Sequence, residues 1–518
     1  MTTSSPTQGV VSRVSLTPPQ RGAHRGIIRL TAWGSVVAAS VVSRLAASIG
    51  YIEDPDSLRF ALSVADTYSL ATLQPHFPGY PVFWAIAKPL YLITGSVATA
   101  FALVGALATV GLIVAGLAVL RVPLASTRGA MWAGVILVCP LVWLMGTRYM
   151  PDLLGLAVAL GILAAALHAM ESGRIRDAAR AGVLGGLLAG LRLSYIPFVA
   201  LPLVGLLLGY RVSRVRGHRP PRTSRGRFAG ALFGGGALGV VLWLIPLVLD
   251  TGWNHLLAAA DRQTVGHFTD FGGTIQSDGA GLSERLVLTA RSVWADGLGG
   301  WWPGRHPMTA VVGIALVLGL VVGGREAVRL VRLRDYARRV VTWGLPSAAT
   351  YAVWIVLYQN VVHKSRHALP LIAIALCLLA LGAARVWDTH GRWRPLARGM
   401  VLAGFGAVAV VAVTLTAQHR QPSAIAQVTA HVREVIEANP DAQIVTTPLV
   451  RYTLEQQGIR APFLDATAPG ALARLPEADL LAIGSQIPGR EATRADTFYH
   501  NPFVNRMWAE IQVYRYTP

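Results

Sequence analysis

The stretch at 53–83 concentrates side chains that are able to do acid–base chemistry. It contains four carboxylates and a histidine, namely Glu53, Asp54, Asp56, Asp66 and His76. A carboxylate can take a proton from a hydroxyl as a general base, or can hold Mg²⁺ or Mn²⁺ through its oxygens. Because a charge near lipid is costly unless it faces protein or water, these acids beside a long apolar segment indicate a functional site.

The rest of the chain has the composition of an integral membrane protein. Of its 518 residues, 53% are hydrophobic and only 14% are charged, whereas soluble domains carry about 25% charged residues. The formal net charge of +20 falls mostly in short loops between apolar runs, so it indicates membrane topology rather than nucleic-acid binding. Cys139 and Cys377 both lie inside apolar runs, which argues against a disulfide framework or a thiolate metal site.

Apolar runs predict about eleven transmembrane helices. They lie at 27–50, 97–120, 130–145, 153–170, 228–249, 307–322, 341–358, 368–384 and 400–416, with two more at 181–210. The run at 181–210 could form one transmembrane helix or two short ones. A single span would place the seven arginines at 211–227 on the outer side. Because basic loops stay in the cytoplasm, we favour two short helices that turn near Arg192. The run at 80–92 is too short to span and predicts an interfacial helix.

These elements divide the chain into three parts. Residues 1–26 are rich in Pro, Ser, Thr and Arg, which predicts a disordered cytoplasmic N-terminus. Residues 27–417 form the transmembrane domain, with a first outer loop at 51–96, and residues 418–518 have the patterns of a small α/β domain. In this last part, helices are expected at 424–438 and 449–457 and strands at 443–447, 479–483 and 511–516. The predicted fold class is an all-α polytopic membrane protein with a small C-terminal, extracytoplasmic α/β domain.

The positive-inside rule also brings distant polar segments to one face of the membrane. The acidic stretch, Asp152, the loop at 363–367 and the C-terminal domain are all expected outside, opposite the basic loops. Lys364 and Arg366 depart from the rule because they place positive charge on the outer face, and this departure favours a functional role for them.

Three segments resemble the GT-C class of membrane glycosyltransferases, close to the dolichyl-phosphate-mannose-protein mannosyltransferase superfamily. They are Glu-Asp-Pro-Asp-Ser at 53–57, Gln-Pro-His-Phe-Pro-Gly-Tyr-Pro at 74–81 and Arg-Tyr-Met-Pro-Asp at 148–152. The second segment has Phe77 where the family's His-Pro-Pro-Gly-Tyr-Pro pattern has proline. The resemblance covers residues 1–210, and beyond them hydropathy and topology alone match.

The resemblance implies sugar transfer from a polyprenyl-phosphate donor, on the extracytoplasmic face of a bacterial cytoplasmic (inner) membrane. Such a transfer needs a carboxylate that takes the proton of the acceptor hydroxyl, and the family's usual inverting outcome requires no covalent intermediate. Asp54 is the first candidate for this base and Asp56 the second. The choice between them stays open, since Pro55 is expected to break the local helix. Asp152 is expected to orient the acceptor or to help hold a metal ion.

The leaving lipid phosphate needs cationic partners, and arginine suits phosphate because it binds in a bidentate way. The candidates for substrate binding are Glu53, His76, Tyr80, Arg148, Arg192, Lys364, Arg366 and His367. Some of these residues could instead have purely structural roles. Glu53 and Asp56 could serve as helix caps or as charges at the membrane interface. Arg148 also fits a pair with Asp152. If a metal ion binds, Mg²⁺ or Mn²⁺, its ligands are expected to be Asp54 and Asp56, but the sequence does not require a metal ion.

Other functions are compatible with parts of the sequence. A transporter or lipid flippase tends to show internal repeats and charges at the bilayer midplane, whereas no repeat is evident here and the polar clusters gather at one face. A scaffold protein would need one anchoring helix rather than many. A lipid-linked glycan ligase or polymerase would have a similar arrangement of transmembrane helices, and this alternative function is kept. The expected partners are the lipid membrane, a polyprenyl-phosphate sugar, with mannose or arabinose ranked first, and a glycan, lipid or protein acceptor, without nucleic acid.

Overall fold

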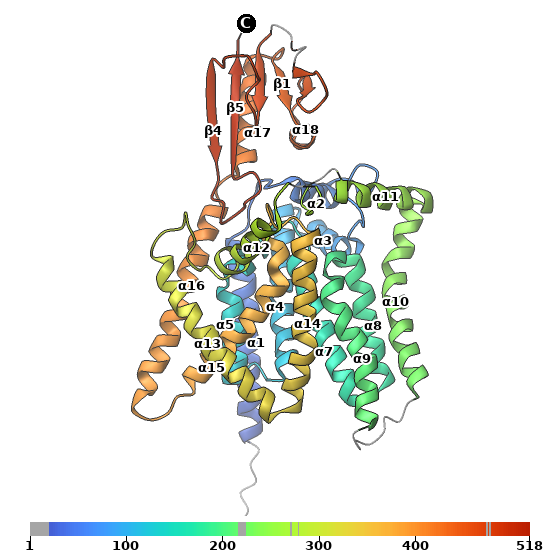
Figure 1. Ribbon diagram of the computed structural model, residues 1–518, viewed down its shortest axis with the longest axis vertical. Helices are drawn as coiled ribbons and strands as arrows, with labels where there is room; N and C mark the ends of the chain where they lie inside the picture. The colour runs from blue at the N-terminus through green and yellow to red at the C-terminus, as the bar shows by residue number, and fades with distance from the viewer. Residues whose placement is uncertain are drawn as a thin grey trace, which may run out of the picture.

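The protein is a bundle of long helices with a small sheet domain at one end (Figure 1). The computed structural model describes residues 20–215, 224–269, 272–277, 279–472, 475 and 478–517. Helix α1 begins at Gln20, so most of the N-terminus that was expected to be disordered lies outside the described residues. The predicted fold class, a polytopic helical membrane protein with a small C-terminal sheet domain, is confirmed.

The helices of the bundle follow the predicted apolar runs. Their bounds are α1 Gln20–Ala46, α4 Val97–Leu120, α5 Thr127–Val138, α6 Pro140–Met145, α7 Asp152–Ser172, α8 Ile175–Leu191, α9 Ile196–Val215, α10 Arg225–Thr251, α13 Thr309–Leu333, α14 Asp335–Tyr358, α15 Leu369–Trp387 and α16 Arg394–His419. In the described part of the chain, eight helices are long and apolar enough to cross a membrane. The span expected at 130–145 is instead two shorter helices, because Pro140 cannot continue α5 and begins α6.

The ambiguous run at 181–210 is two helices rather than one. Helix α8 ends at Leu191, a 3₁₀ turn η1 covers Leu193–Tyr195, and α9 begins at Ile196. The turn is therefore at Arg192, as expected, and α8 and α9 run side by side through the bundle (Figure 1). Of the arginine-rich segment that follows α9, residues 216–223 lie outside the described residues.

A layer of short helices lies between the bundle and the sheet domain (Figure 1). It contains α2 Pro55–Ala65, α3 Pro81–Thr94, α11 Trp253–Thr269, α12 Leu282–Arg291, η2 Ser292–Gly297 and η3 Ser365–Ala368. Helix α3 is the short apolar helix expected at 80–92, and α11 and α12 lie in the long loop between α10 and α13.

The prediction that Pro55 breaks the local helix is wrong. Pro55 is the first residue of α2, and Asp54 is its N-cap, with Oδ1 2.8 Å from the Ser57 backbone nitrogen. Proline suits a first helical position because that N–H would have no helical partner in any case. The acidic segment is therefore held rigidly at the start of a helix.

The opposite end of the bundle carries the basic loops. Arg121 after α4 and Arg339 in α14 both reach Glu171 at the end of α7, at 2.5 and 3.5 Å. Arg128 lies 2.9 Å from Glu326 of α13. The 3₁₀ turn η4 Gly391–Trp393 joins α15 to α16 at this end. These pairs show that positive residues from several loops gather at the end away from the sheet domain.

The sheet domain contains two helices and a five-stranded sheet. The elements are α17 Ala424–Ala438, β1 Gln443–Thr446, α18 Pro448–Gln456, β2 Phe463–Asp465, β3 Leu480–Ile483, β4 Arg494–Tyr499 and β5 Glu510–Tyr516. The strand order is β2-β1-β3-β5-β4, with β1 parallel to β2 and β3, and β5 antiparallel to β3 and β4. The sequence patterns predict the two helices and three of the strands, and they miss β2 and β4. Strand β2 has three residues and β4 is mostly exposed, so neither has a clear apolar pattern.

Candidate active site

Arg366 of η3 brings together three carboxylates from two distant parts of the chain. Its Nη1 lies 3.3 Å from Asp54 Oδ2, its Nη2 donates a hydrogen bond to Asp56 Oδ2, and its Nε lies 3.8 Å from Asp152 Oδ1. The Arg366 side chain is buried, at 5% exposure. Since an isolated buried charge is very costly, these acids and this cation depend on one another.

Asp56 is the most exposed of the three carboxylates and has the most cationic partners. Lys364 Nζ lies 2.6 Å from Asp56 Oδ2, and Arg59, one turn along α2, lies 3.7 Å from Oδ1. Burial would raise the pKa of Asp56, but Lys364 and Arg366 outweigh burial and hold this pKa well below its usual range. Asp56 is therefore ionised at neutral pH, and while these partners stay in place it is a weak base.

Asp152, the first residue of α7, is paired with the turn between α8 and α9. Arg192 Nη2 lies 2.8 Å from Asp152 Oδ1, and Arg192 Nη1 lies 3.4 Å from the hydroxyl oxygen of Tyr80. Tyr80 is in turn 3.1 Å from Nε2 of His76. Burial lowers the pKa of His76 to about 3, so its ring is neutral at neutral pH. The chain of contacts links the proline-rich loop to the carboxylate cluster.

Several buried polar atoms of this cluster have no hydrogen-bond partner among the described residues. They are Asp152 Oδ2, Arg192 Nε, His76 Nδ1 and His367 Nδ1. Buried polar groups in native proteins are nearly always hydrogen-bonded. Unpaired donors and acceptors that gather beside Arg192 and Asp152 are therefore suited to the polar groups of a bound molecule.

Glu53 and Arg148 are in a separate network. The Glu53 side chain is fully buried, with Oε2 3.0 Å from Arg148 Nε and Oε1 2.8 Å from His419 Nε2. Burial would raise the pKa of Glu53, but Arg148 and His419 outweigh it and lower this pKa to about 2. Arg148 also donates to the carbonyl of Val504 in the sheet domain. This arrangement fits a structural connection between the bundle and the sheet domain, rather than contact with a substrate.

The structure thus brings together eight of the eleven residues singled out from the sequence. They are Asp54, Asp56, His76, Tyr80, Asp152, Arg192, Lys364 and Arg366. His367 adjoins them in the chain; its side chain is buried and its carbonyl accepts a hydrogen bond from Tyr351 at 2.9 Å.

Sequence reasoning missed Arg59, Tyr195 and His419. The only sequence signal for Arg59 was its position one helical turn after Asp56, and the other two have none.

The carboxylates do not form a ready metal site. Asp54 and Asp56 would be the ligands, yet both oxygens of Asp54 are already hydrogen-bonded, and Asp56 is surrounded by three cationic side chains. No group of three or more His, Cys, Asp or Glu side chains that could hold a metal ion is found in the described ranges. The arrangement fits an anion near Lys364 and Arg366 better than a metal ion.

Comparison with solved structures identifies the class of fold. ArnT from Cupriavidus metallidurans, solved bound to undecaprenyl phosphate, has a TM-score of 0.53 to this chain at 14% identity, with 94% of this chain and 97% of that chain covered. The same protein in the apo state has the same TM-score and identity, with 95% and 98% covered. The chain therefore has a GT-C-like membrane fold over nearly its whole length, and the expectation from the resemblance is confirmed at the level of fold.

A second solved structure is more distant. The oligosaccharyltransferase of Archaeoglobus fulgidus, in complex with zinc and sulfate, has a TM-score of 0.44 at 12% identity and covers 82% of this chain. This chain spans only 62% of the length of that protein. No family model and no curated protein matches the sequence.

Proposed function

We propose that this protein is a membrane glycosyltransferase that transfers a sugar from a polyprenyl-phosphate donor to an acceptor hydroxyl. The observation that carries the proposal is the cluster of Asp54, Asp56 and Asp152 with Arg192, Lys364 and Arg366 at one end of a GT-C-like bundle. The likeness to ArnT solved with undecaprenyl phosphate supports a polyprenyl-phosphate ligand of this kind.

The phosphate of the donor is expected to bind Lys364 and Arg366. Lys364 is the more accessible, with a side chain that is 16% exposed, and a guanidinium such as that of Arg366 binds phosphate through two parallel hydrogen bonds. Arg192, which contacts Tyr80, lies next to this position, because Arg192 and Arg366 both face Oδ1 of Asp152. A bound phosphate would compete with the carboxylates for the same cations.

Asp54 is the proposed general base. Its Oδ1 is held by the helix N-terminus, while its Oδ2 has one partner, Arg366, at 3.3 Å. When the phosphate draws Arg366 away, Oδ2 becomes available to take the proton of the acceptor hydroxyl. The acceptor oxygen then forms a bond to the anomeric carbon, the bond from that carbon to the phosphate oxygen breaks, and polyprenyl phosphate leaves with the electron pair. Asp56 and Asp152 are proposed to position the cations.

The proposal also includes the side of the membrane that the candidate site and the sheet domain face. Basic loops gather at the end away from the sheet domain, and basic loops favour the cytoplasmic side. The candidate site and the sheet domain would then face the extracytoplasmic side of a bacterial cytoplasmic membrane. The sheet domain lies close to the site, because Arg59 of α2 is stacked over Tyr452 of α18, 5.4 Å from the ring centre.

The experiment that tests this function uses purified full-length protein with a panel of radiolabelled polyprenyl-phosphate sugars, mannose and arabinose first. Glycan, lipid and peptide acceptors are supplied, with and without EDTA. The proposal expects turnover of one donor that EDTA does not abolish. Binding of polyprenyl phosphate without turnover of any donor, across the whole acceptor panel, would count against an enzyme.

A further inference from the structure

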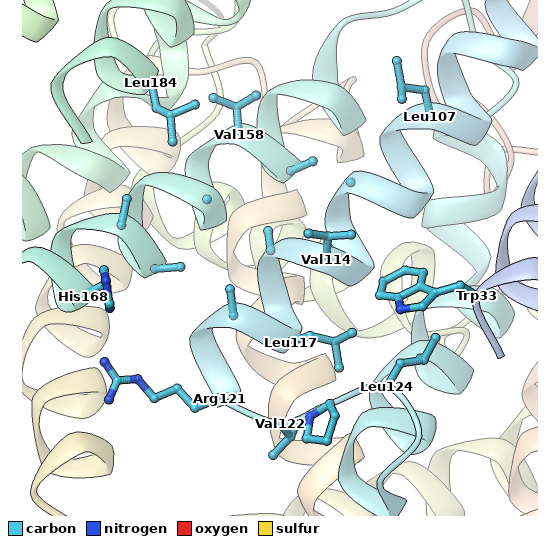
Figure 2. A pocket seen from close by; sticks show the side chains of 18 of the residues that line it. Trp33, Leu107, Val114, Leu117, Arg121, Val122, Leu124, Val158, His168 and Leu184 are labelled. Carbon is cyan, nitrogen blue, oxygen red and sulfur yellow. The ribbon is translucent and has the colours of Figure 1, made fainter. Parts of the chain in front are cut away.

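A long groove runs along α4 and α7, from Leu154, which lies two residues after Asp152 of the candidate site, to the end of the bundle that carries the basic loops. It has a volume of about 1080 Å³ and follows the packed faces of α4 and α7, between Trp33 of α1 and Leu184 of α8. Figure 2 shows that Leu107, Val158 and Leu184 lie at one end and Arg121, Val122 and Leu124 at the other. Leu107 and Val114 are about half exposed, so the groove opens toward the surrounding lipid.

The shape and lining of the groove suit one hydrocarbon chain. The side chains along it are almost all apolar, and small residues of α4 and α7, among them Gly111 and Gly161, form its floor. From Leu107 to Arg121 a helix rises roughly 21 Å, which is about two thirds of the ~30 Å hydrocarbon core of a bilayer. A chain in this groove would therefore extend from the surface of one leaflet past the bilayer midplane.

The end of the groove beside the basic loops is positively charged. Its lining contains Arg29, Arg121 and His168 and no carboxylate. His168 lies 3.5 Å from Asp177 outside the lining, and Asp177 is also within 4.0 Å of Arg176 and Arg180. Glu171 is near, but it is shared between Arg121 and Arg339, at 2.5 and 3.5 Å, so these three residues keep one net positive charge. Arg29 makes no ion pair with any residue that the structure describes. An anionic group is therefore favoured at this end.

We infer that this groove binds a glycerophospholipid with an anionic head group, taken from the leaflet on the side of the basic loops. An acyl chain fills the apolar part, and the phosphate lies at the end of the groove that Arg29 and Arg121 line. The site is separate from the proposed transfer site and does not depend on the proposed function. Among anionic lipids, phosphatidylglycerol is the probe that tests this claim.

Three variants distinguish binding in the groove from binding elsewhere on the lipid-facing surface. A Cβ added at Gly161 meets no atom within 4 Å, so Gly161→Leu adds a side chain to the groove lining from an open position. Gly234 of α10 is equally unobstructed but lies outside the groove, so Gly234→Leu is the matched control. Arg29→Gln removes an exposed charge and leaves the helix packing unchanged.

The measurement is native mass spectrometry of the full chain in a neutral detergent, titrated with dioleoyl phosphatidylglycerol or dioleoyl phosphatidylcholine. Wild type and Gly234→Leu should bind one tight phosphatidylglycerol that Gly161→Leu lacks at an unchanged melting temperature. Arg29→Gln should bind it roughly fivefold more weakly, since one arginine near an anionic lipid contributes about 1 kcal/mol. Equal binding by Gly161→Leu and wild type would overturn the site. Equal affinity for the two lipids would overturn the claim of an anionic head group.

Discussion

Arg366 Nη1 lies 3.3 Å from Asp54 Oδ2, although the two residues are 312 positions apart in the sequence. Both side chains are almost completely buried. The loop before α15 and the start of α2 are therefore held together by charge, and Asp152 of α7 joins them through Arg366.

Lys364→Gln should weaken donor binding strongly and should lower the stability of the folded protein only slightly. Lys364 makes a charge-assisted contact with Asp56 and is partly exposed, and such contacts contribute about 1.5–3 kcal/mol. We expect the KM for the lipid-linked donor to rise roughly 10- to 100-fold, with a small change in melting temperature. Arg451→Gln, which removes an exposed cation paired with Glu455, is the control and should leave KM unchanged. A KM equal to that of wild type would show that Lys364 does not contact the donor.

Glu53→Gln should destabilise the protein rather than remove a catalytic group. It would leave Arg148 buried without its charged partner, and breaking a buried pair costs about 3–5 kcal/mol. The readout is the melting temperature in detergent, with Glu434→Gln on the exposed face of α17 as the control. A stable Glu53→Gln variant that has lost all turnover would instead place Glu53 in the chemistry.

The pairing of Glu53 also predicts how the stability of the folded protein changes with pH. The pKa of Glu53 is lowered from 4.5 to about 2 in the folded protein, so the folded state binds the proton less readily than the unfolded state. The stabilisation from ionised Glu53 is complete above about pH 4.5 and is lost as the pH falls toward 2. Wild type should therefore lose more thermal stability than Glu53→Gln between pH 5 and pH 3. Parallel melting curves for the two proteins in this range would contradict the pairing of Glu53 with Arg148 and His419.

Arg506 of the sheet domain is expected to position the loop that carries Lys364. Its guanidinium donates to the carbonyls of Val361 and Val362 at 3.0 and 3.2 Å, to Ser292 Oγ at 2.8 Å, and to Asp296. Arg506→Gln should raise the KM for donor about tenfold and lower the melting temperature, since Asp296 keeps only weaker partners. Arg494→Gln on exposed β4 is the matched control. If Arg506→Gln changes the melting temperature alone, the arginine has a purely structural role.

Hydropathy and charge were sufficient to predict most of the bundle. Every long apolar run is helical, and the turn at Arg192 followed from keeping the arginines after α9 on the basic side. The break at Pro140 was missed because the run at 130–145 is apolar on both sides of the proline. The positive charge of Lys364 and Arg366 on the outer face was the sequence signal that favoured a functional role for them, but their pairing with Asp54 and Asp56 was not predicted.

The remaining features depend on contacts between residues that are far apart in the chain. Helix α2 was missed because proline was taken as a helix breaker, whereas Asp54 followed by Pro55 is a favourable start. Nothing in the sequence relates His419 to Glu53, since the two meet only when α16 packs beside the first loop. The sequence already ranked Asp54 first as the base and allowed a structural role for Glu53, but the partners that hold Glu53, Arg148 and His419, required the structure.

The most direct test of the account compares sugar transfer by wild type, Asp54→Asn and Asp56→Asn. Asparagine is a good N-cap, so Asp54→Asn keeps the start of α2 and removes only the charge. The account predicts that this variant folds, still binds polyprenyl phosphate, and transfers sugar roughly 10²- to 10⁴-fold more slowly, which is the usual contribution of a general base. Asp56→Asn should chiefly weaken donor binding. Wild-type turnover by Asp54→Asn would contradict the central claim that this carboxylate is the base.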